Sequence, residues 1–142
     1  MAIVHDMKLR VWYQETDRMG YVHHSNYIRY YEAVRSSFMR WLGLPYAEME
    51  ARGVMMPILE VTSRYLAPAF YEEELTVRLI VEELPSTRFT GRYEVYNEAG
   101  KLINRGATTL CFIRSDSYRP CRAPEWFVEL LRAKMALCEK EN

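Results

Sequence analysis

The sequence has few of the features that mark exported, metal-binding or membrane-spanning proteins. Its three cysteines, Cys111, Cys121 and Cys138, are an odd number without CxxC spacing, which disfavours a disulfide framework and a structural zinc site. The start, MAIVHDMKLR, holds only a short apolar stretch, and no later segment approaches the ~20 apolar residues of a membrane span. We therefore expect an unexported, cytoplasmic protein without a membrane span or bound metal.

The sequence also lacks an excess of charge of one sign. Its 19 basic residues balance its 19 acidic residues, so no long-range field is available to hold nucleic acid or an anionic membrane. An anionic ligand must instead be bound by a local cluster. A chain of 142 residues, 49% of them hydrophobic, is long enough for one compact domain and too short for two. We expect a single domain over residues 1–142.

Hydrophobic periodicity predicts a strand followed by one long helix. Met7–Tyr13 alternates with period two, as in a half-buried strand. In Tyr27–Leu42 apolar residues recur at three- and four-residue steps, which is typical of an amphipathic helix. Ser25 or Asn26 is a suitable N-cap, and Gly43 suits a left-handed C-terminal cap. A second apolar stripe on this helix indicates that more than one of its sides is buried.

After a short helix over Pro45–Arg52, strand patterns replace helical ones. Strands are expected over Pro57–Leu66, Glu73–Leu84, Arg88–Tyr96 and Leu102–Arg114. The short connection from Asn97 to Gly100 predicts an antiparallel hairpin. Residues 124–139 should form a C-terminal helix, with Pro124 at its first position. The order predicts an α+β fold in which an antiparallel sheet covers one long helix.

One segment between the first strand and the long helix resembles a family signature. YQETDRMGYVHHSNYIRYYEAVRSSFMRWLG is similar to the T-D-x-x-G-x-V motif and aromatic-rich helix of the acyl-CoA thioesterases related to 4-hydroxybenzoyl-CoA thioesterase. The later YLAPAFYEEELTV resembles that family's proline-containing bend and acidic strand start. The resemblance covers roughly residues 7 to 114. It implies the hotdog fold, an antiparallel sheet wrapped around one long central helix.

Asp17 is the main catalytic candidate in this segment. A thioester carbonyl needs a nucleophile or a base that activates water, and an aspartate is anionic at neutral pH. Asp17 could attack the carbonyl to give a mixed anhydride, or it could deprotonate water; the sequence does not choose between these routes. Taken alone, TDRMG is more typical of an Asx turn, in which Gly20 supplies a left-handed conformation.

The start of the long helix offers the second catalytic element. Unpaired peptide N–H groups and the positive end of the helix dipole stabilise a developing oxyanion. The resemblance implies that the peptide N–H of His24 points at the thioester oxygen. The imidazole of His24 could also take part or orient Asp17, or it could simply cap the helix or lie in solvent. His23 is polar where many relatives are apolar, and its role is left open. Glu15 is expected to be solvated.

The resemblance also implies residues that bind the substrate. Gly20, Val22 and Tyr27 lie in the first motif, although tyrosines at helical spacing are more often core residues. A partner subunit is expected to contribute the far wall through the MPILE stretch, and a loop at the start of a later strand is expected to meet the phosphates of coenzyme A. The residues concerned are Pro57, Ile58, Ser86, Thr87 and Arg88.

The leading interpretation is a thioesterase that hydrolyses acyl-CoA without a cofactor, coenzyme A being part of the substrate. It implies a homodimer that assembles into a homotetramer. One alternative is hydrolysis of an acyl thioester of acyl carrier protein, and another is a hotdog protein that binds acyl-CoA without cleaving it. A hotdog hydratase is disfavoured, because it needs a later Asp and His pair and no histidine follows His24.

Overall fold

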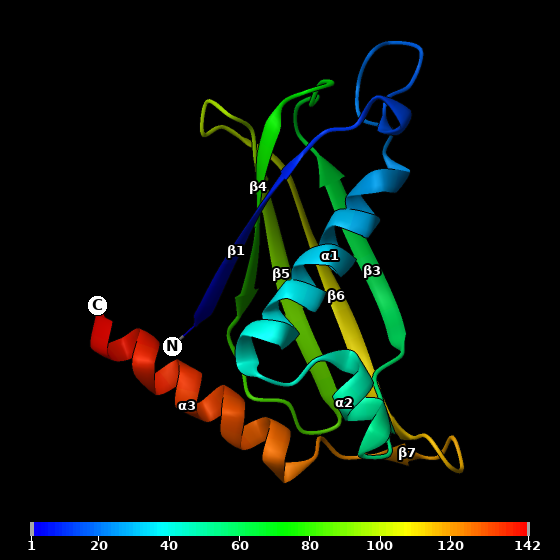
Figure 1. Ribbon diagram of the computed structural model, residues 1–142, viewed down its shortest axis with the longest axis vertical. Coiled ribbons are helices and arrows are strands. Elements are labelled where there is room, and N and C mark those ends of the chain that lie inside the picture. Colours follow the sequence, from blue (N-terminus) through cyan, green and yellow to red (C-terminus); the bar gives the residue numbers. More distant parts are fainter. Residues whose placement is uncertain (1, 142) are drawn as a thin grey trace.

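The computed structural model describes residues 2–141 and shows one long helix held in a curved antiparallel sheet (Figure 1). The helices are α1 (Ser25–Leu42), α2 (Tyr46–Ala51) and α3 (Glu125–Glu141), and a 3-10 turn, η1, covers Tyr13–Glu15. The strands are β1 (Ile3–Arg10), β2 (Val54–Met55), β3 (Ile58–Tyr65), β4 (Glu74–Val81), β5 (Arg88–Tyr96), β6 (Leu102–Arg114) and β7 (Pro120–Cys121). The expected α+β architecture is confirmed.

The sheet places the five long strands in the order β1-β4-β5-β6-β3, all antiparallel to their neighbours. The short strands β2 and β7 pair with the last residues of β6. The predicted hairpin joins β5 to β6: the N–H of Gly100 donates to the carbonyl of Asn97 at 2.9 Å. β3 pairs with β6 on one side, so its other side is an edge of the sheet.

The core lies between α1 and the inner face of the sheet. Alternation along β4 buries Leu75, Val77 and Leu79, while α1 buries residues on two stripes, as its doubled apolar pattern predicts. Gly43 ends α1 in the left-handed conformation, with φ of 82°. The helix is therefore fixed along its length and stopped at a defined residue.

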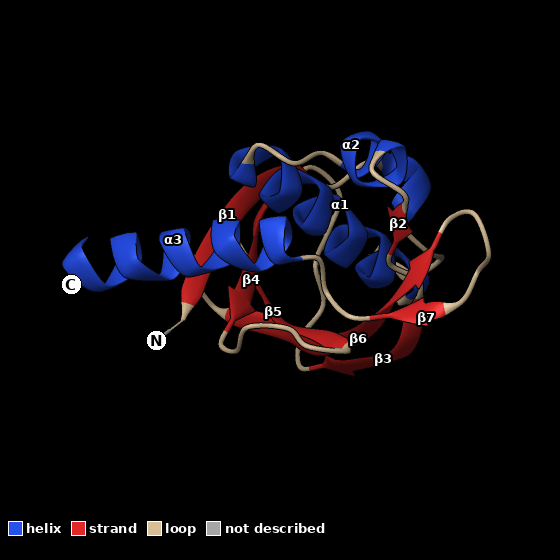
Figure 2. Cartoon of the chain, turned by 90° about the horizontal axis from the view of Figure 1, so that it is seen from below, coloured by secondary structure: helices blue, strands red, loops and turns tan. Residues whose placement is uncertain are grey.

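α3 lies across one end of this sheet, and its C-terminal turns project beyond β1 (Figure 2). Phe127 and Leu131 are fully buried against the core, and the Lys134 ammonium lies 4.1 Å from the centroid of the Trp41 ring of α1. The opposite end of the sheet carries the loops that precede α1 and β4 (Figure 1). Within residues 2–141, no helix has both the length and the apolar character needed to cross a membrane.

Some predicted boundaries are wrong. The first strand runs over Ile3–Arg10 rather than Met7–Tyr13, because the chain turns away from the sheet at η1 and leaves Tyr13 exposed. α1 already includes Ser25 and Asn26, so neither is the N-cap; that position belongs to His24. β2 and β7 were not predicted, because a strand of two residues is too short to show an alternating hydrophobic pattern.

Candidate active site

Asp17 begins a tight turn between η1 and α1. Its N–H donates to the carbonyl of Tyr21 at 2.8 Å, and an isolated bridge joins Thr16 to Val22. Gly20 has φ of +81°, and its N–H donates to the carbonyl of Asp17 at 3.0 Å. This conformation is costly for residues with a Cβ, so the expected left-handed glycine is confirmed.

The Asp17 carboxylate takes part in this turn through one oxygen. Oδ1 accepts the N–H of Met19 at 2.9 Å and the N–H of Tyr21 at 3.2 Å, which is an Asx-type arrangement. Within residues 2–141, no donor is bonded to Oδ2. The side chain is thus exposed and held in place by Oδ1, while Oδ2 has no partner among the described residues.

The start of α1 has an imidazole cap. Nδ1 of His23 lies 2.8 Å from Oγ of Ser25 and accepts the peptide N–H of Ser25 at 3.3 Å. The His23 and His24 rings stack with centroids 4.1 Å apart and planes 32° apart. His24 makes no side-chain capping bond, and in the described part of the chain its peptide N–H has no acceptor. The role left open for His23 is therefore to cap the helix and pack against His24.

Glu15 connects this helix start to the preceding turn. Its carbonyl accepts the N–H of His23 at 2.8 Å and Nδ2 of Asn26 at 2.9 Å, and its Oε1 accepts the N–H of Trp12 at 2.8 Å. Asn26 is 8% exposed. Glu15 is half-buried rather than simply solvated: its carbonyl holds the start of α1, and its carboxylate accepts the N–H that precedes the η1 turn.

A pocket of about 330 Å³ lies between this turn and the end of β3. Its inner wall is Tyr27, which is only 3% exposed, and the hydroxyl of Tyr65 donates to the carbonyl of His24 at 3.2 Å. Burial, with Tyr31 and Tyr65 nearby, raises the pKa of Tyr27 to about 12, so its phenol stays neutral. The lining residues are Asp17, Tyr21, Val22, His24, Tyr27, Tyr65, Leu66, Ala67 and Pro68.

The loop between β3 and β4 forms the outer side of this pocket. The N–H of Val22 donates to the carbonyl of Ala69 at 2.9 Å, and the rings of Tyr21 and Phe70 meet edge to face, with centroids 5.4 Å apart. Glu73 accepts the N–H of Phe70 at 3.1 Å. The loop is therefore joined to the Asp17 turn by both backbone and ring contacts.

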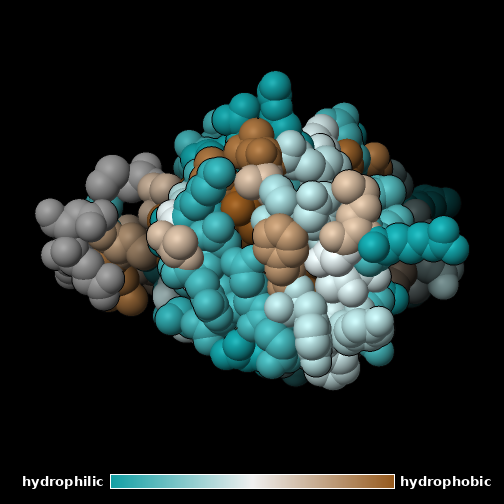
Figure 3. Space-filling model, turned by 90° about the horizontal axis from the view of Figure 1, so that it is seen from above, coloured by the Kyte–Doolittle hydropathy of each residue, from teal (hydrophilic) through white to brown (hydrophobic). Residues whose placement is uncertain are grey.

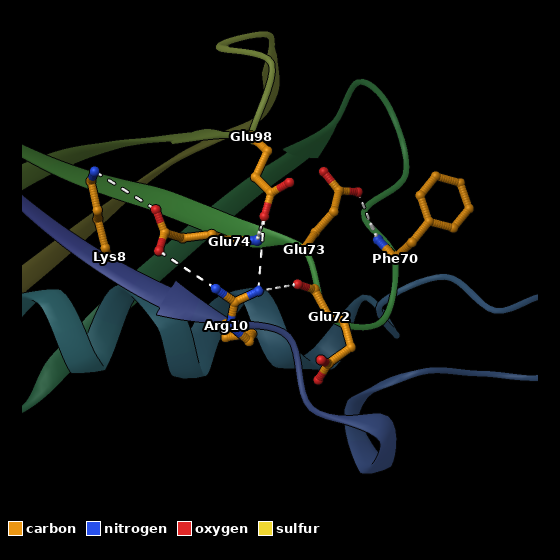
Figure 4. A network of polar contacts seen from close by, with 7 residues as sticks. All are labelled: Lys8, Arg10, Phe70, Glu72, Glu73, Glu74 and Glu98. Atoms are coloured by element: carbon orange, nitrogen blue, oxygen red, sulfur yellow. Dashed lines mark hydrogen bonds and ion pairs between the residues drawn. The ribbon is translucent and has the colours of Figure 1, made fainter.

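Charged residues of the neighbouring strands hold the far end of this loop (Figure 4). Arg10 of β1 donates to the carbonyl of Glu72 at 2.6 Å and lies 3.8 Å from Glu74 and 3.9 Å from Glu98. Lys8 lies 3.7 Å from Glu74. The ends of β1 and β4 and the β5–β6 turn therefore support one wall of the pocket.

The surface at this end of the molecule is partly apolar (Figure 3). Several large apolar side chains around the two loops are exposed: Trp12, Tyr13, Met19, Tyr65, Leu66, Phe70 and Tyr71. Patches of this kind mark surfaces that meet a ligand or another protein. Among residues 2–141, no group of three His, Cys, Asp or Glu side chains is placed to hold a metal ion.

Four of the predicted site residues come together in this pocket: Asp17, Val22, His24 and Tyr27. Gly20 lies in the adjoining turn. Four further lining residues were not predicted: Tyr65, Leu66, Ala67 and Pro68. The sequence signal for this wall is the proline of YLAPAF, which follows a predicted strand in the segment that resembles the family's proline-containing bend.

The remaining predicted residues lie at the other end of the sheet. Pro57 and Ile58 stand at the beginning of β3, and seven residue steps of ~3.3 Å each separate Ile58 from Tyr65 by about 23 Å. Thr87 and Arg88 line a second pocket of about 580 Å³ together with Arg122. The carbonyl of Ser86 accepts the N–H of Ala123 at 2.7 Å. A single chain therefore does not bring these residues to Asp17.

The fold and the strand-turn-helix site define a hotdog protein of the thioesterase class. The sequence-family model of the thioesterase-like superfamily matches residues 11–131, and the chain belongs to this family. The resemblance noted in the sequence and the expected enzyme class are thereby confirmed.

Individual relatives agree with this membership. The acyl-CoA thioesterase YbgC of Helicobacter pylori is 31% identical over 136 residues, which is 89% of this chain and 99% of that protein. The DHNA-CoA thioesterase of Staphylococcus aureus superposes with a TM-score of 0.86 at 31% identity, covering 98% of this chain and 95% of that one. A 4-hydroxybenzoyl-CoA thioesterase shares the fold, with a TM-score of 0.81 at 23% identity over 90% and 98% of the two chains.

Proposed function

We propose that this protein hydrolyses acyl-CoA thioesters to a free acid and coenzyme A, with residues 1–142 acting as one domain and without a cofactor. The observation that carries the proposal is the pairing of two unused groups at one pocket. Oδ2 of Asp17 and the peptide N–H of His24 have no partner among the described residues, and both residues line the pocket of about 330 Å³.

Two routes are compatible with this geometry. Oδ2 of Asp17 can attack the thioester carbonyl, expelling the coenzyme A thiolate and leaving a mixed anhydride that water then hydrolyses. Alternatively, the carboxylate takes a proton from water, the hydroxide adds to the carbonyl, and the thiolate leaves and takes up that proton. In both routes negative charge develops on the carbonyl oxygen.

The start of α1 can stabilise that charge. The helix has 18 residues, and its N-terminus presents the positive end of its dipole together with the N–H of His24. In a well-studied protease, removing one such hydrogen-bond donor from a preformed site lowers kcat about 10²–10³-fold. The imidazole of His24 also lines the pocket, where it can orient Asp17 or the attacking water.

The substrate-binding residues at the far end of β3 fit this function only in an oligomer. β3 is an edge strand and exposes Ile58, Leu59 and Tyr65 at 42%, 53% and 48%. Such an edge favours pairing with another strand. Antiparallel pairing of β3 with its copy about a two-fold axis would put Pro57 of the partner subunit and Ile58 of the partner subunit near Tyr65.

The same pairing would bring the partner's Thr87 and the partner's Arg88 to the side of the Asp17 pocket. A guanidinium is suited to the phosphates of coenzyme A. We therefore include Ser86, Thr87 and Arg88 in the substrate site, to which they would be contributed across the interface of a homodimer. We propose that this dimer assembles further into a homotetramer and that the protein acts in the cytoplasm.

One rival function has structural support. A hotdog protein that binds acyl-CoA without cleaving it would need Asp17 only as a turn residue, and the two hydrogen bonds to Oδ1 fit that role. Hydrolysis of an acyl thioester on a carrier protein uses the same chemistry and differs only in what lies beyond the pocket.

Thiol release from a panel of acyl-CoA substrates tests the proposal. In Asp17→Asn, the amide oxygen can still accept the N–H groups of Met19 and Tyr21, so the turn should persist while the nucleophile or base is lost. Turnover should fall at least ~100-fold while substrate still binds. Asp116→Asn is the matched control, since that exposed aspartate lies in the turn before β7. Near-normal turnover of Asp17→Asn would exclude the mechanism, and binding without turnover by the unaltered protein would support the rival.

A further inference from the structure

The candidate pocket ends at a wall of tyrosine side chains. Tyr27 forms this wall, and Tyr31 lies four residues further along the same face of α1. Tyr31 is fully buried and stacks on Tyr93 of β5, with ring centroids 4.4 Å apart and planes 18° apart. The space between helix and sheet is therefore filled by side chains directly behind the pocket.

Hydrogen bonds hold the Tyr31 ring in this place. Its hydroxyl lies 2.8 Å from Oγ of Ser63 and also donates to Oδ1 of Asn104. Nδ2 of Asn104 donates to the same Ser63 oxygen at 3.1 Å, and Asn104 has no exposed surface. Displacing the ring would break this network and leave buried polar groups without partners.

The sheet is shaped to receive the same hydroxyl at Gly106. A Cβ atom at this position would overlap both the Tyr31 hydroxyl and the Thr62 carbonyl oxygen. At Gly106 the hydroxyl of Tyr31 therefore rests against bare backbone. An acyl chain that extended along α1 into the core would have to displace Tyr31 from these contacts.

We propose that Tyr27, supported by Tyr31, closes the acyl-binding space, so that the enzyme selects compact acyl groups, short aliphatic chains or single rings, over long chains. This inference rests on the proposed hydrolase function and names its substrate class. The pocket of about 330 Å³ in one chain is at the lower end of the ~300–1,000 Å³ range of ligand sites, and its open side is where the proposed partner subunit would add a further wall. The rings of Tyr27 and Tyr65, 5.4 Å apart and near perpendicular, provide the surface that such a group would contact.

A series of acyl-CoA substrates tests the proposal. Acetyl-, butyryl-, hexanoyl-, benzoyl-, dodecanoyl- and palmitoyl-CoA are compared by kcat/KM below their micelle concentrations. With the unaltered protein, kcat/KM for dodecanoyl-CoA should be at least ~10-fold below that for butyryl-CoA, because one methylene group in a closed apolar pocket already changes discrimination by about 10–200-fold. The kcat/KM for benzoyl-CoA should be closer to that for butyryl-CoA than to that for dodecanoyl-CoA.

Two substitutions of Tyr27 test whether its ring causes the preference for short acyl chains. Tyr27→Val removes the ring and should raise the ratio of dodecanoyl to butyryl kcat/KM at least ~10-fold. Tyr27→Phe keeps the ring, and its ratio should stay within about twofold of the unaltered protein. Thermal unfolding shows whether each variant folds. If Tyr27→Val does not fold, the series on the unaltered protein still decides the proposal.

The outcomes separate this inference from the function on which it rests. Equal kcat/KM for palmitoyl- and butyryl-CoA would overturn the closed pocket while supporting the hydrolase. If no substrate releases thiol, the proposed function fails, and the pocket is tested by binding of the same series to Asp17→Asn. Weaker binding of long chains would support the closed pocket, and equal binding of all lengths would overturn it.

Discussion

The imidazole of His23 stacks on the imidazole of His24, with centroids 4.1 Å apart, and at the same time accepts the peptide N–H of Ser25. One ring thus has two separable contacts, a cap on α1 and a packing surface for the ring that lines the pocket. Two substitutions remove these contacts one at a time.

His23→Asn keeps an acceptor for the Ser25 N–H and loses the stacked ring. Its thermal stability should stay close to that of the unaltered protein, while kcat falls about two- to tenfold, the size of a lost ring contact worth about 0.5–1.5 kcal/mol. His23→Phe keeps a ring that can stack on His24 but loses the acceptor for the Ser25 N–H. Its free energy of unfolding should fall by about 0.5–2 kcal/mol, and its kcat should be higher than that of His23→Asn. Parallel losses in both variants would show that the two contacts are not separable.

His24→Ala removes an imidazole but leaves the peptide N–H at the start of α1. We expect kcat to fall about tenfold, less than in Asp17→Asn, because the proposed oxyanion donor remains and only the contribution of the ring is lost. Steady-state kinetics on a short acyl-CoA measures both variants side by side. A larger loss than in Asp17→Asn would give the ring the main role.

Gly106→Ala should destabilise the protein by about 1–3 kcal/mol, since the new Cβ meets the Tyr31 hydroxyl and a backbone carbonyl that cannot yield. Gly91→Ala is the matched control. Its Cβ would lie 2.8 Å from Cδ1 of Leu79, which can rotate away, so the loss should be smaller. Urea denaturation of both variants gives the comparison, and a larger loss for Gly91→Ala would contradict the packing described for Tyr31.

Arg35 is a buried cation on α1, 7% exposed, whose NH1 donates to the hydroxyl of Tyr93 at 3.2 Å and whose Nε has no acceptor among the described residues. Arg35→Met should leave stability unchanged or raise it, because a long apolar side chain fills the site without a charge. The hydroxyl of Tyr93 keeps Oγ1 of Thr108 as a partner at 2.7 Å. Arg35→Ala should cost about 2–5 kcal/mol through the cavity it leaves. A marked drop in the melting temperature of Arg35→Met would show that the charge itself is required.

His5 should make stability depend on pH. Burial lowers the pKa of its imidazole below 6.5; Asp6 opposes this effect and Arg40 adds to it. Since the unfolded chain takes up the proton more readily, stability should be full above pH 6.5 and decrease as the pH falls below that value. The free energy of unfolding measured from pH 8 to pH 5 should decrease less in His5→Gln than in the unaltered protein. An identical pH profile for the two proteins would exclude His5 as a source of the dependence.

Local patterns were enough to predict α1, the hairpin at Asn97 and the Asp17 turn, because period, caps and turn residues act over a few neighbouring positions. Long-range register was not predictable in the same way. Nothing near Arg88 in the sequence shows that it lies at the opposite end of the sheet from Asp17, and this follows only once β5 is paired with β6.

The imidazole cap illustrates a second limit. The sequence showed His23 next to His24 and offered Ser25 and Asn26 as caps, which is what propensity favours. The structure instead uses the ring of His23, because the Glu15 carbonyl fixes the backbone of His23 and the side chain of Asn26 together. Such a choice depends on a contact between residues that are eleven positions apart.

The two hydrogen bonds from Met19 and Tyr21 to Oδ1 mean that the Asp17 carboxylate is oriented before any ligand arrives. A side chain held by two hydrogen bonds has less conformational entropy to lose in the proposed reaction than a freely rotating one. If the proposed hydrolysis is right, the turn role and the chemical role of this aspartate are not alternatives, because the same two hydrogen bonds that close the turn also orient the carboxylate.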